Sequence, residues 1–67
     1  MAESTILACV GGRITQSACG EHWTVIDAWT DRRVTIEASE GRKRLDAFNR
    51  RWPRAEYLSA IRHILGD

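Results

Sequence analysis

The spacing of apolar residues changes near residue 40, and this change constrains the fold more than any other feature of the sequence. Residues 4–39 are rich in Thr, Val, Ile and Trp between turn residues, which favours β-strands. Residues 40–66 repeat apolar side chains at helical spacing. The sequence therefore predicts an α+β fold. We expect a small antiparallel β-meander of three to four strands at about residues 5–39, packed against two short C-terminal α-helices at about 40–52 and 54–65.

The length of the chain limits the core that it can build. Its 67 residues are expected to form a single domain, 1–67. A chain of this size buries only about 60% of the surface that it exposes when unfolded, so each large apolar side chain matters. Hydrophobic residues make up 43% of the sequence, which is too many for a disordered chain.

The stretch ILACVGGRITQSA predicts a first β-hairpin. Gly11 and Gly12 can supply the positive φ angles of a two-residue turn, which would place Cys9 opposite Ile14. The residues expected to share its inner face are Leu7, Cys9, Ile14 and Ala18.

A second hairpin is expected from strands at 22–29 and 34–39, joined by a turn at 30–33. Its register has two alternatives, because a slip of one residue exchanges the two faces of a strand. A two-residue or four-residue loop places Trp29 opposite Val34. A three-residue loop instead buries Ile26, Ala28, Ile36 and Ala38.

We prefer the first register, because a small core gains most from burying large aromatic side chains. Trp23, Val25 and Trp29 then face the core, with Asp27 among them. A buried carboxylate must be paired or protonated. We expect Asp27 to pair with an Arg of the first helix or a Trp indole N–H, as a structural group rather than a general base.

The first helix is predicted from three apolar residues, Leu45, Phe48 and Trp52, which recur at i, i+3 and i+7 and should dock inward together. Ser39 can cap its N-terminus. Pro53 ends this helix and suits the first turn of a second helix. The residues expected on the inner face of that second helix are Tyr57, Leu58, Ile61, Ile64 and Leu65.

Charge is distributed unevenly along the chain. Residues 1–40 hold three basic and six acidic side chains, whereas residues 41–67 hold seven basic and three acidic ones. The candidate binding residues in and after the first helix are Arg42, Lys43, Arg44, Arg50, Arg51, Trp52 and Arg54. Arg binds phosphate oxygens in bidentate fashion, and Trp52 could stack on a base. A solvated helix face and a surface that meets an acidic protein patch are the alternative interpretations.

Cys19 and His22 have a C-x2-H spacing, and Cys9 and His63 could complete a set of four zinc ligands. In the expected hairpin Cys19 lies about 17 Å along the strand from the level of Cys9. The sequence therefore predicts no metal site, no cofactor and no disulfide between Cys9 and Cys19.

No enzymatic motif is present in the sequence: G-x-S-x-G, H-E-x-x-H and a phosphate-cradling Gly-rich loop are all missing. We therefore predict no catalytic residue and no enzymatic activity. The apolar run of residues 6–10 is too short for a signal peptide or a membrane span. The expected location is the cytoplasm, of the host cell if a phage encodes the chain.

The stretch RRVTIEASEGRKRLDAFNRRWPRAEYLSAIRHIL resembles ribbon-helix-helix repressors in its order of one strand and two short helices. That resemblance implies a dimer whose paired strands read the DNA major groove. Here the strand would present Thr35 and Glu37, and residues 22–29 would already pair with it, so we do not assign the chain to that family. In size and charge it also looks like small phage inhibitors, including anti-CRISPR proteins, with no shared residues.

These patterns predict a small non-enzymatic binding module of the regulator or inhibitor kind, which uses a basic helix face to engage nucleic acid or a nucleoprotein complex. The alternative is an anti-CRISPR-like inhibitor that docks on an acidic protein surface and does not bind free nucleic acid. A thin core also gains stability by dimerising, so a homodimer is a third interpretation.

Overall fold

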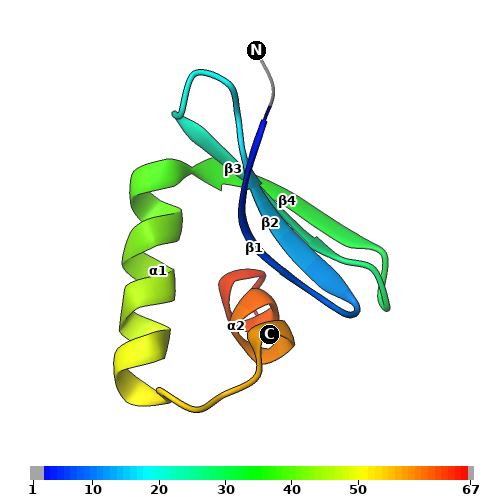
Figure 1. The fold of residues 1–67 in the computed structure, drawn as a ribbon, viewed down its shortest axis with the longest axis vertical. Helices are drawn as coiled ribbons and strands as arrows, with labels where there is room; N and C mark the ends of the chain where they lie inside the picture. Colours follow the sequence, from blue (N-terminus) through cyan, green and yellow to red (C-terminus); the bar gives the residue numbers. More distant parts are fainter. Residues whose placement is uncertain (1–2, 67) are drawn as a thin grey trace.

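The computed structural model describes residues 3–66 as a sheet followed by two helices. The strands are β1 (Ser4–Cys9), β2 (Gly12–Gln16), β3 (His22–Asp27) and β4 (Arg32–Glu37), followed by α1 (Ala38–Arg51) and α2 (Tyr57–Ile64). The strands form one antiparallel sheet in the order β1-β2-β3-β4. The predicted α+β class, the meander and the two C-terminal helices are confirmed (Figure 1).

The two helices pack in different ways. α2 contacts β1, β2 and β3 and covers the inner face of the sheet. α1 contacts β3, β4 and α2, and it extends along one side of the molecule away from the end of β4 (Figure 1). One side of α1 is therefore left to the solvent along its whole length.

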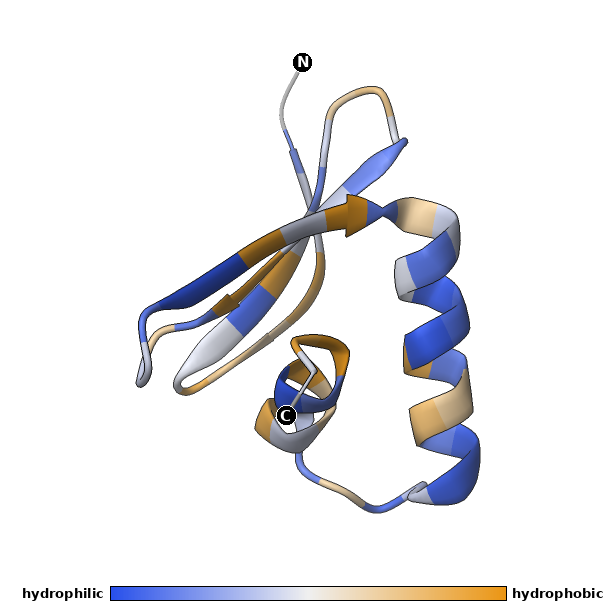
Figure 2. Cartoon of the chain, turned by 180° about the vertical axis from the view of Figure 1, so that it is seen from behind, coloured by the Kyte–Doolittle hydropathy of each residue, from blue (hydrophilic) through white to orange (hydrophobic). Residues whose placement is uncertain are grey.

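The core lies between the sheet and the two helices. Its buried residues are Ile14, Trp23 and Val25 from the sheet, Leu45 and Phe48 from α1, and Ala60, Ile61, Ile64 and Leu65 from the α2 region. Trp23 is the largest of these fully buried side chains, and its indole N–H donates to Gln16 Oε1 at 3.0 Å. Figure 2 shows hydrophobic segments both in the sheet and in α2, on the two sides of this interior.

The first hairpin turns one residue earlier than predicted. Cys9 pairs with Gly12, so the two turn residues are Val10 and Gly11. Gly11 takes the positive φ of 92° that the turn requires. Gly12 belongs to β2 and is buried. Ile61 packs so close to it that a Cβ at this position would lie 2.9 Å from Ile61 Cδ1.

The inner face of this hairpin was predicted correctly for three of its four residues. Leu7, Cys9 and Ile14 pack in or against the core. Ala18 instead lies in the turn after β2 and is exposed. The face is retained because moving the turn by one residue shifts the pairing by two residues, from Cys9 opposite Ile14 to Cys9 opposite Gly12, and an even shift leaves the same side chains inward.

The second hairpin adopts neither of the registers that we considered. Asp27 pairs with Arg32, which leaves residues 28–31 as the turn. The Asp27 carboxylate accepts the backbone N–H of Trp29 at 2.9 Å and of Thr30 at 3.4 Å. These side-chain bonds compete with the β-ladder and end the strand two residues before the predicted position.

The preferred faces are nevertheless correct within β3. Trp23, Val25 and Asp27 are all fully buried, as expected. Trp29 was expected in the core but lies in the turn with 65% of its surface exposed. Its ring packs against Gly11, where a Cβ would clash with the indole.

Both helix starts differ from the prediction. α1 follows β4 with no intervening loop, its N-cap is Glu37 rather than Ser39, and no side chain caps it. α2 begins at Tyr57, three residues later than expected, because Pro53 and Arg54 form a turn instead of a first helical turn. Neither helix of the described chain is long and apolar enough to cross a membrane.

The outer face of the sheet carries no helix. The residues that line a shallow polar depression there are Glu3, Arg13, Thr15, Thr24, Ile26, Arg33 and Thr35. β4 is an edge strand that pairs with β3 alone. The expected pairing with residues 22–29 thus occupies one edge of β4 and leaves its other edge without a partner strand among residues 3–66.

Candidate functional site

Four cations project from the exposed side of α1. They are Arg42, Lys43, Arg50 and Arg51, and we call them the basic face. Leu45 and Phe48 are buried on the other side of the helix, so Lys43 and Arg50 point away from the protein. Among residues 3–66 no carboxylate forms an ion pair with the basic face. Figure 2 shows α1 as predominantly hydrophilic.

Arg44 lies on α1 but is held within the protein. Its Nε donates to Glu40 Oε1 at 3.0 Å, and its Nη1 donates to the main-chain oxygen of Ile64 at 3.1 Å. Ile64 is the last residue of α2, so the guanidinium also lies at the negative end of that helix dipole. Arg44 therefore joins the two helices and is not part of the basic face.

Trp52 caps the C-terminus of α1 and is 43% exposed. Its ring lies 5.0 Å from that of Phe48 and 6.1 Å from that of His63, measured between centroids. The Arg51 guanidinium lies 4.8 Å from its centroid. The expectation that Trp52 docks inward thus holds for one part of the ring only. A base that stacks on the exposed part must share the indole with Arg51.

The remaining predicted binding residues differ in their surroundings. The Arg42 guanidinium lies 5.1 Å from the ring centroid of Trp23, which orients it without neutralising its charge. Arg54 is exposed in the connection between α1 and α2. Of the seven predicted residues, four form the basic face, Trp52 and Arg54 follow at the end of the helix, and Arg44 is engaged elsewhere.

Asp27 is buried in an ion pair, as predicted, but its partner comes from the second helix. Arg62 Nε donates to Asp27 Oδ2 at 3.0 Å. Burial raises the pKa of this carboxyl, but the hydrogen bonds from Arg62 and from the N–H groups of Trp29 and Thr30 outweigh burial and hold the pKa below its usual value. A carboxylate that stays ionised and fully engaged connects the β3–β4 turn to α2 and is a poor general base.

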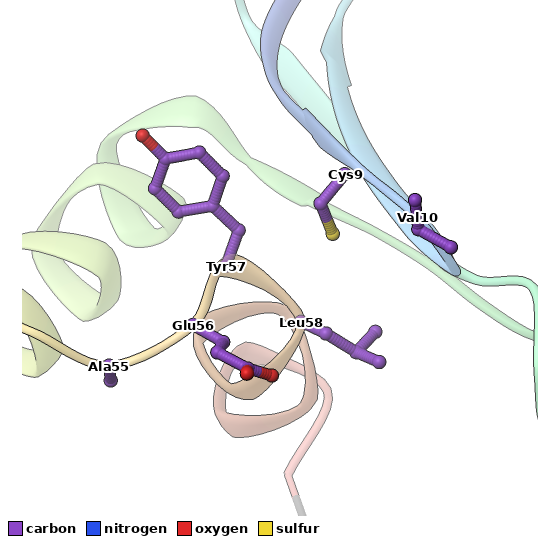
Figure 3. A pocket seen from close by; sticks show the side chains of 6 residues that line it. All are labelled: Cys9, Val10, Ala55, Glu56, Tyr57 and Leu58. Atoms are coloured by element: carbon purple, nitrogen blue, oxygen red, sulfur yellow. The ribbon is translucent and has the colours of Figure 1, made fainter.

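A patch of exposed apolar side chains lies near the β-hairpin turns. Val10 is 83% exposed, Trp29 65% and Tyr57 60%, and we call these three residues the apolar patch. Trp29 packs over Gly11 beside Val10, and Val10 and Tyr57 line one hollow of about 390 Å³. Figure 3 shows Val10 and Tyr57 on either side of that hollow, between the end of β1 and the start of α2.

Sequence reasoning missed the apolar patch because it placed Trp29 and Tyr57 in the core. Tyr57 follows the helical spacing of the buried residues of α2, but as the first residue of the helix it lies at the rim. No pattern in the sequence distinguishes it from Ile61, which is fully buried.

The two cysteines are free and lie near opposite ends of β2. Cys9 pairs with Gly12 at the start of that strand, whereas Cys19 lies in the turn after it. The length of β2 therefore separates the two cysteines, which a single tetrahedral ion would need to lie close together. The donor atoms of Cys19, Glu21 and His22 nevertheless lie within 4.8 Å of one another, and the C-x2-H spacing of Cys19 and His22 is the part of this cluster that the sequence indicated.

Known proteins give no indication of what this chain does. No protein-family model matches the chain, and no curated protein sequence or solved structure shows significant similarity to it.

Proposed function

We propose that this chain is a small, non-enzymatic binding module whose basic face engages the phosphate backbone of a nucleic acid, free or within a nucleoprotein complex. The observation that supports the proposal is a set of four exposed cations on one side of α1 without ion-pair partners among residues 3–66. Such cations add little to folding, because solvent screens them. Each can instead displace a condensed counterion from a phosphate.

The geometry of α1 suits a nucleic-acid groove. Lys43 and Arg50 are seven residues apart, which is about 10 Å along the helix axis. At about 100° per residue, Arg42 and Arg51 lie on opposite flanks of these two. An α-helix fits the DNA major groove, which is about 12 Å wide, and flanking arginines can then reach phosphates on both sides. Arg54 and the exposed part of Trp52 would extend the contact beyond the helix.

A titration of fluorescently labelled random-sequence DNA, duplex and single-stranded, tests this proposal. We expect binding at low salt that weakens steeply as salt rises. The double variant Arg50→Glu/Arg51→Glu should lower affinity by roughly tenfold or more, since each reversal removes a phosphate contact and adds a repulsion. The control is Arg13→Glu/Arg33→Glu, which makes the same charge change on the outer face of the sheet and should change affinity much less.

Failure of the unmodified chain to bind either DNA at low salt would contradict the proposal. An equal loss of affinity in both double variants would also contradict it, because net charge rather than the basic face would then control binding. Circular dichroism of each variant confirms that the fold is retained.

A second candidate function is supported by the apolar patch. Val10, Trp29 and Tyr57 expose large apolar side chains, with Trp29 against Gly11 next to Val10, and Val10 and Tyr57 around one hollow. Large exposed apolar patches are typical of protein-binding sites. Under this alternative the chain is a protein-binding inhibitor that does not bind free nucleic acid.

The two candidates differ in which residues matter. If a protein is the partner, pull-down from lysate should recover one defined protein. Capture should then be lost in Trp29→Ser/Tyr57→Ser and retained in Arg50→Glu/Arg51→Glu. Loss of capture in the arginine variant alone would assign protein binding to the basic face, and nuclease treatment then separates direct capture from capture through nucleic acid.

A further inference from the structure

A cluster of metal-ligating side chains lies apart from the basic face, in and beside the turn that joins β2 to β3. Cys19 offers its Sγ atom, Glu21 a carboxylate oxygen and His22 a ring nitrogen, and the three atoms lie within 4.8 Å of one another. All three residues are exposed, so neither burial nor a core contact explains why these donors come together.

We propose that Cys19, Glu21 and His22 bind a divalent transition-metal ion of borderline softness, with zinc the best match and water completing the coordination. A thiolate, an imidazole and a carboxylate are all zinc ligands, and the thiolate disfavours the hard ions Mg²⁺ and Ca²⁺. Tetrahedral bonds of about 2.0–2.3 Å require donor atoms about 3.5 Å apart. The donors must therefore approach by little more than 1 Å, which exposed side chains can do by rotating.

The turn is held in place before any ion binds. The N–H of Ser17 donates to the His22 oxygen at 2.9 Å, and that of Gly20 to the Ser17 oxygen at 2.9 Å. The Glu21 oxygen accepts the N–H of Ala38, the first residue of α1, at 2.9 Å. The backbone that carries the three donors is thus fixed to both β3 and α1, so binding costs little ordering of the chain.

Two neighbouring groups favour coordination. The Ser17 hydroxyl lies 3.3 Å from Cys19 Sγ, where it can donate a hydrogen bond to a metal-bound thiolate. Binding converts the thiol to a thiolate and releases its proton to solvent, and thiolate and carboxylate together neutralise the ion. Glu37 lies opposite His22 on the outer face, where its carboxylate can accept the N–H of the ring nitrogen that does not bind metal.

This inference departs from the sequence-based prediction of no metal site. That prediction was argued from the distance between Cys9 and Cys19. It did not consider a site of three ligands with water in the fourth position, which is the arrangement that the turn permits.

Titration of the reduced protein with Co²⁺, a spectroscopic substitute for zinc, tests the proposal. We expect a thiolate-to-cobalt charge-transfer band in the near ultraviolet that saturates at one ion per chain and disappears when Zn²⁺ is added. Cys19→Ser should abolish the band. His22→Gln and Glu21→Gln should weaken binding by about tenfold or more, and Glu37→Gln by about tenfold.

The chain offers matched controls, because its other cysteine and histidine lie outside the cluster. Cys9→Ser and His63→Gln should leave the band unchanged. Absence of the band in the unmodified protein, or its persistence in Cys19→Ser, would overturn the proposal. Zn²⁺ should also raise the Tm of the unmodified chain and of Cys9→Ser but not of Cys19→Ser, since an ion that binds only the folded state stabilises it.

Discussion

Gly41 and Trp23 determine how closely α1 approaches the sheet. Gly41 is buried within α1, and a Cβ built there would lie 2.4 Å from the Trp23 ring. The absence of a side chain lets the helix backbone rest on the largest buried residue of the core. In a helix interior glycine costs about 1 kcal/mol relative to alanine, so its place here reflects packing rather than helix propensity.

The variant Gly41→Ala should therefore destabilise the protein although it improves helix propensity. A methyl group that pushes on a close-packed ring costs about 1–3 kcal/mol, and the propensity gain offsets only part of that cost. Urea denaturation measures the effect. The control Asn49→Ala, at an exposed position of α1, should instead stabilise the chain by about 0.5 kcal/mol. A gain in stability for Gly41→Ala would contradict the close contact.

Asp27 makes folding stability depend on pH. Its native pKa lies below its usual value, so the unfolded chain binds more protons in the acid range. The stability that Asp27 contributes is present above the unfolded pKa of about 3.9 and is lost as pH falls through the native pKa. Asp27→Asn should thus lower the urea midpoint at neutral pH, and the difference from the unmodified chain should shrink as pH falls below about 4.

A neighbouring carboxylate provides the control for the substitution itself. Asp31 is exposed in the same turn and takes a positive φ of 57°, which Asn tolerates well. Asp31→Asn should leave the urea midpoint at neutral pH close to that of the unmodified chain. A midpoint difference for Asp27→Asn that stays constant from neutral to acid pH would show that its ionisation does not contribute.

For single residues, burial was easier to predict from the sequence than the pairing of strands. The alternation of Trp23, Val25 and Asp27 identified the inner face of β3, because side-chain period depends only on strand geometry. The position of the next turn depends on whether the Asp27 carboxylate accepts hydrogen bonds from the backbone N–H groups of Trp29 and Thr30. These bonds compete closely with two further residue pairs of the β-ladder. The outward position of Trp29 follows from that choice, and no local pattern reveals it.

Among the helices and strands, α1 differs most between its two sides: one packs in the core and the other carries exposed cations. Leu45 and Phe48 gave the periodicity that predicted the helix and its inner side correctly. All five cations of the helix were predicted to belong to the binding surface, whereas Arg44 turns back to the end of α2. That contact depends on where α2 ends in space, which sequence periodicity does not determine.

Arg44→Gln should loosen the junction between α1 and α2. It removes the bonds to Glu40 and to the Ile64 oxygen, and because the Arg44 side chain is 44% exposed we expect a loss of only about 0.5–1 kcal/mol. For a domain of this size that is a fall in Tm of about 2–8 °C. Lys43→Gln, next to it on the same helix, should change Tm by much less. Equal effects of the two substitutions would show that the Arg44 contacts contribute nothing.

At the scale of the whole molecule, the distribution of charge matters more than its sum. The net charge is only +1, yet the basic face concentrates four cations on one side of α1. Under the proposed function, an anionic polymer would be attracted to that side and oriented by it, although the protein as a whole is nearly neutral. The position of the cations along the chain was predictable from sequence. Their lack of ion pairs with the carboxylates of residues 3–66 was not predictable, because Asp46 and Glu40 lie within one helical turn of several of them.

The salt dependence of DNA binding measures how many of these cations contact phosphate together. The logarithm of affinity should fall by roughly 0.9 per tenfold rise in salt for each phosphate neutralised, so four contacts give a slope of about −3.6. Lys43→Gln should reduce the magnitude of the slope by about 0.9 and weaken binding equally for all DNA sequences, since a phosphate contact carries no base information. Arg33→Gln removes the same charge from the outer face of the sheet and should leave the slope unchanged. If both substitutions reduce the slope equally, the DNA responds to net charge and not to α1. If only Lys43→Gln reduces it, the side of α1 that packing leaves uncovered is the side that binds.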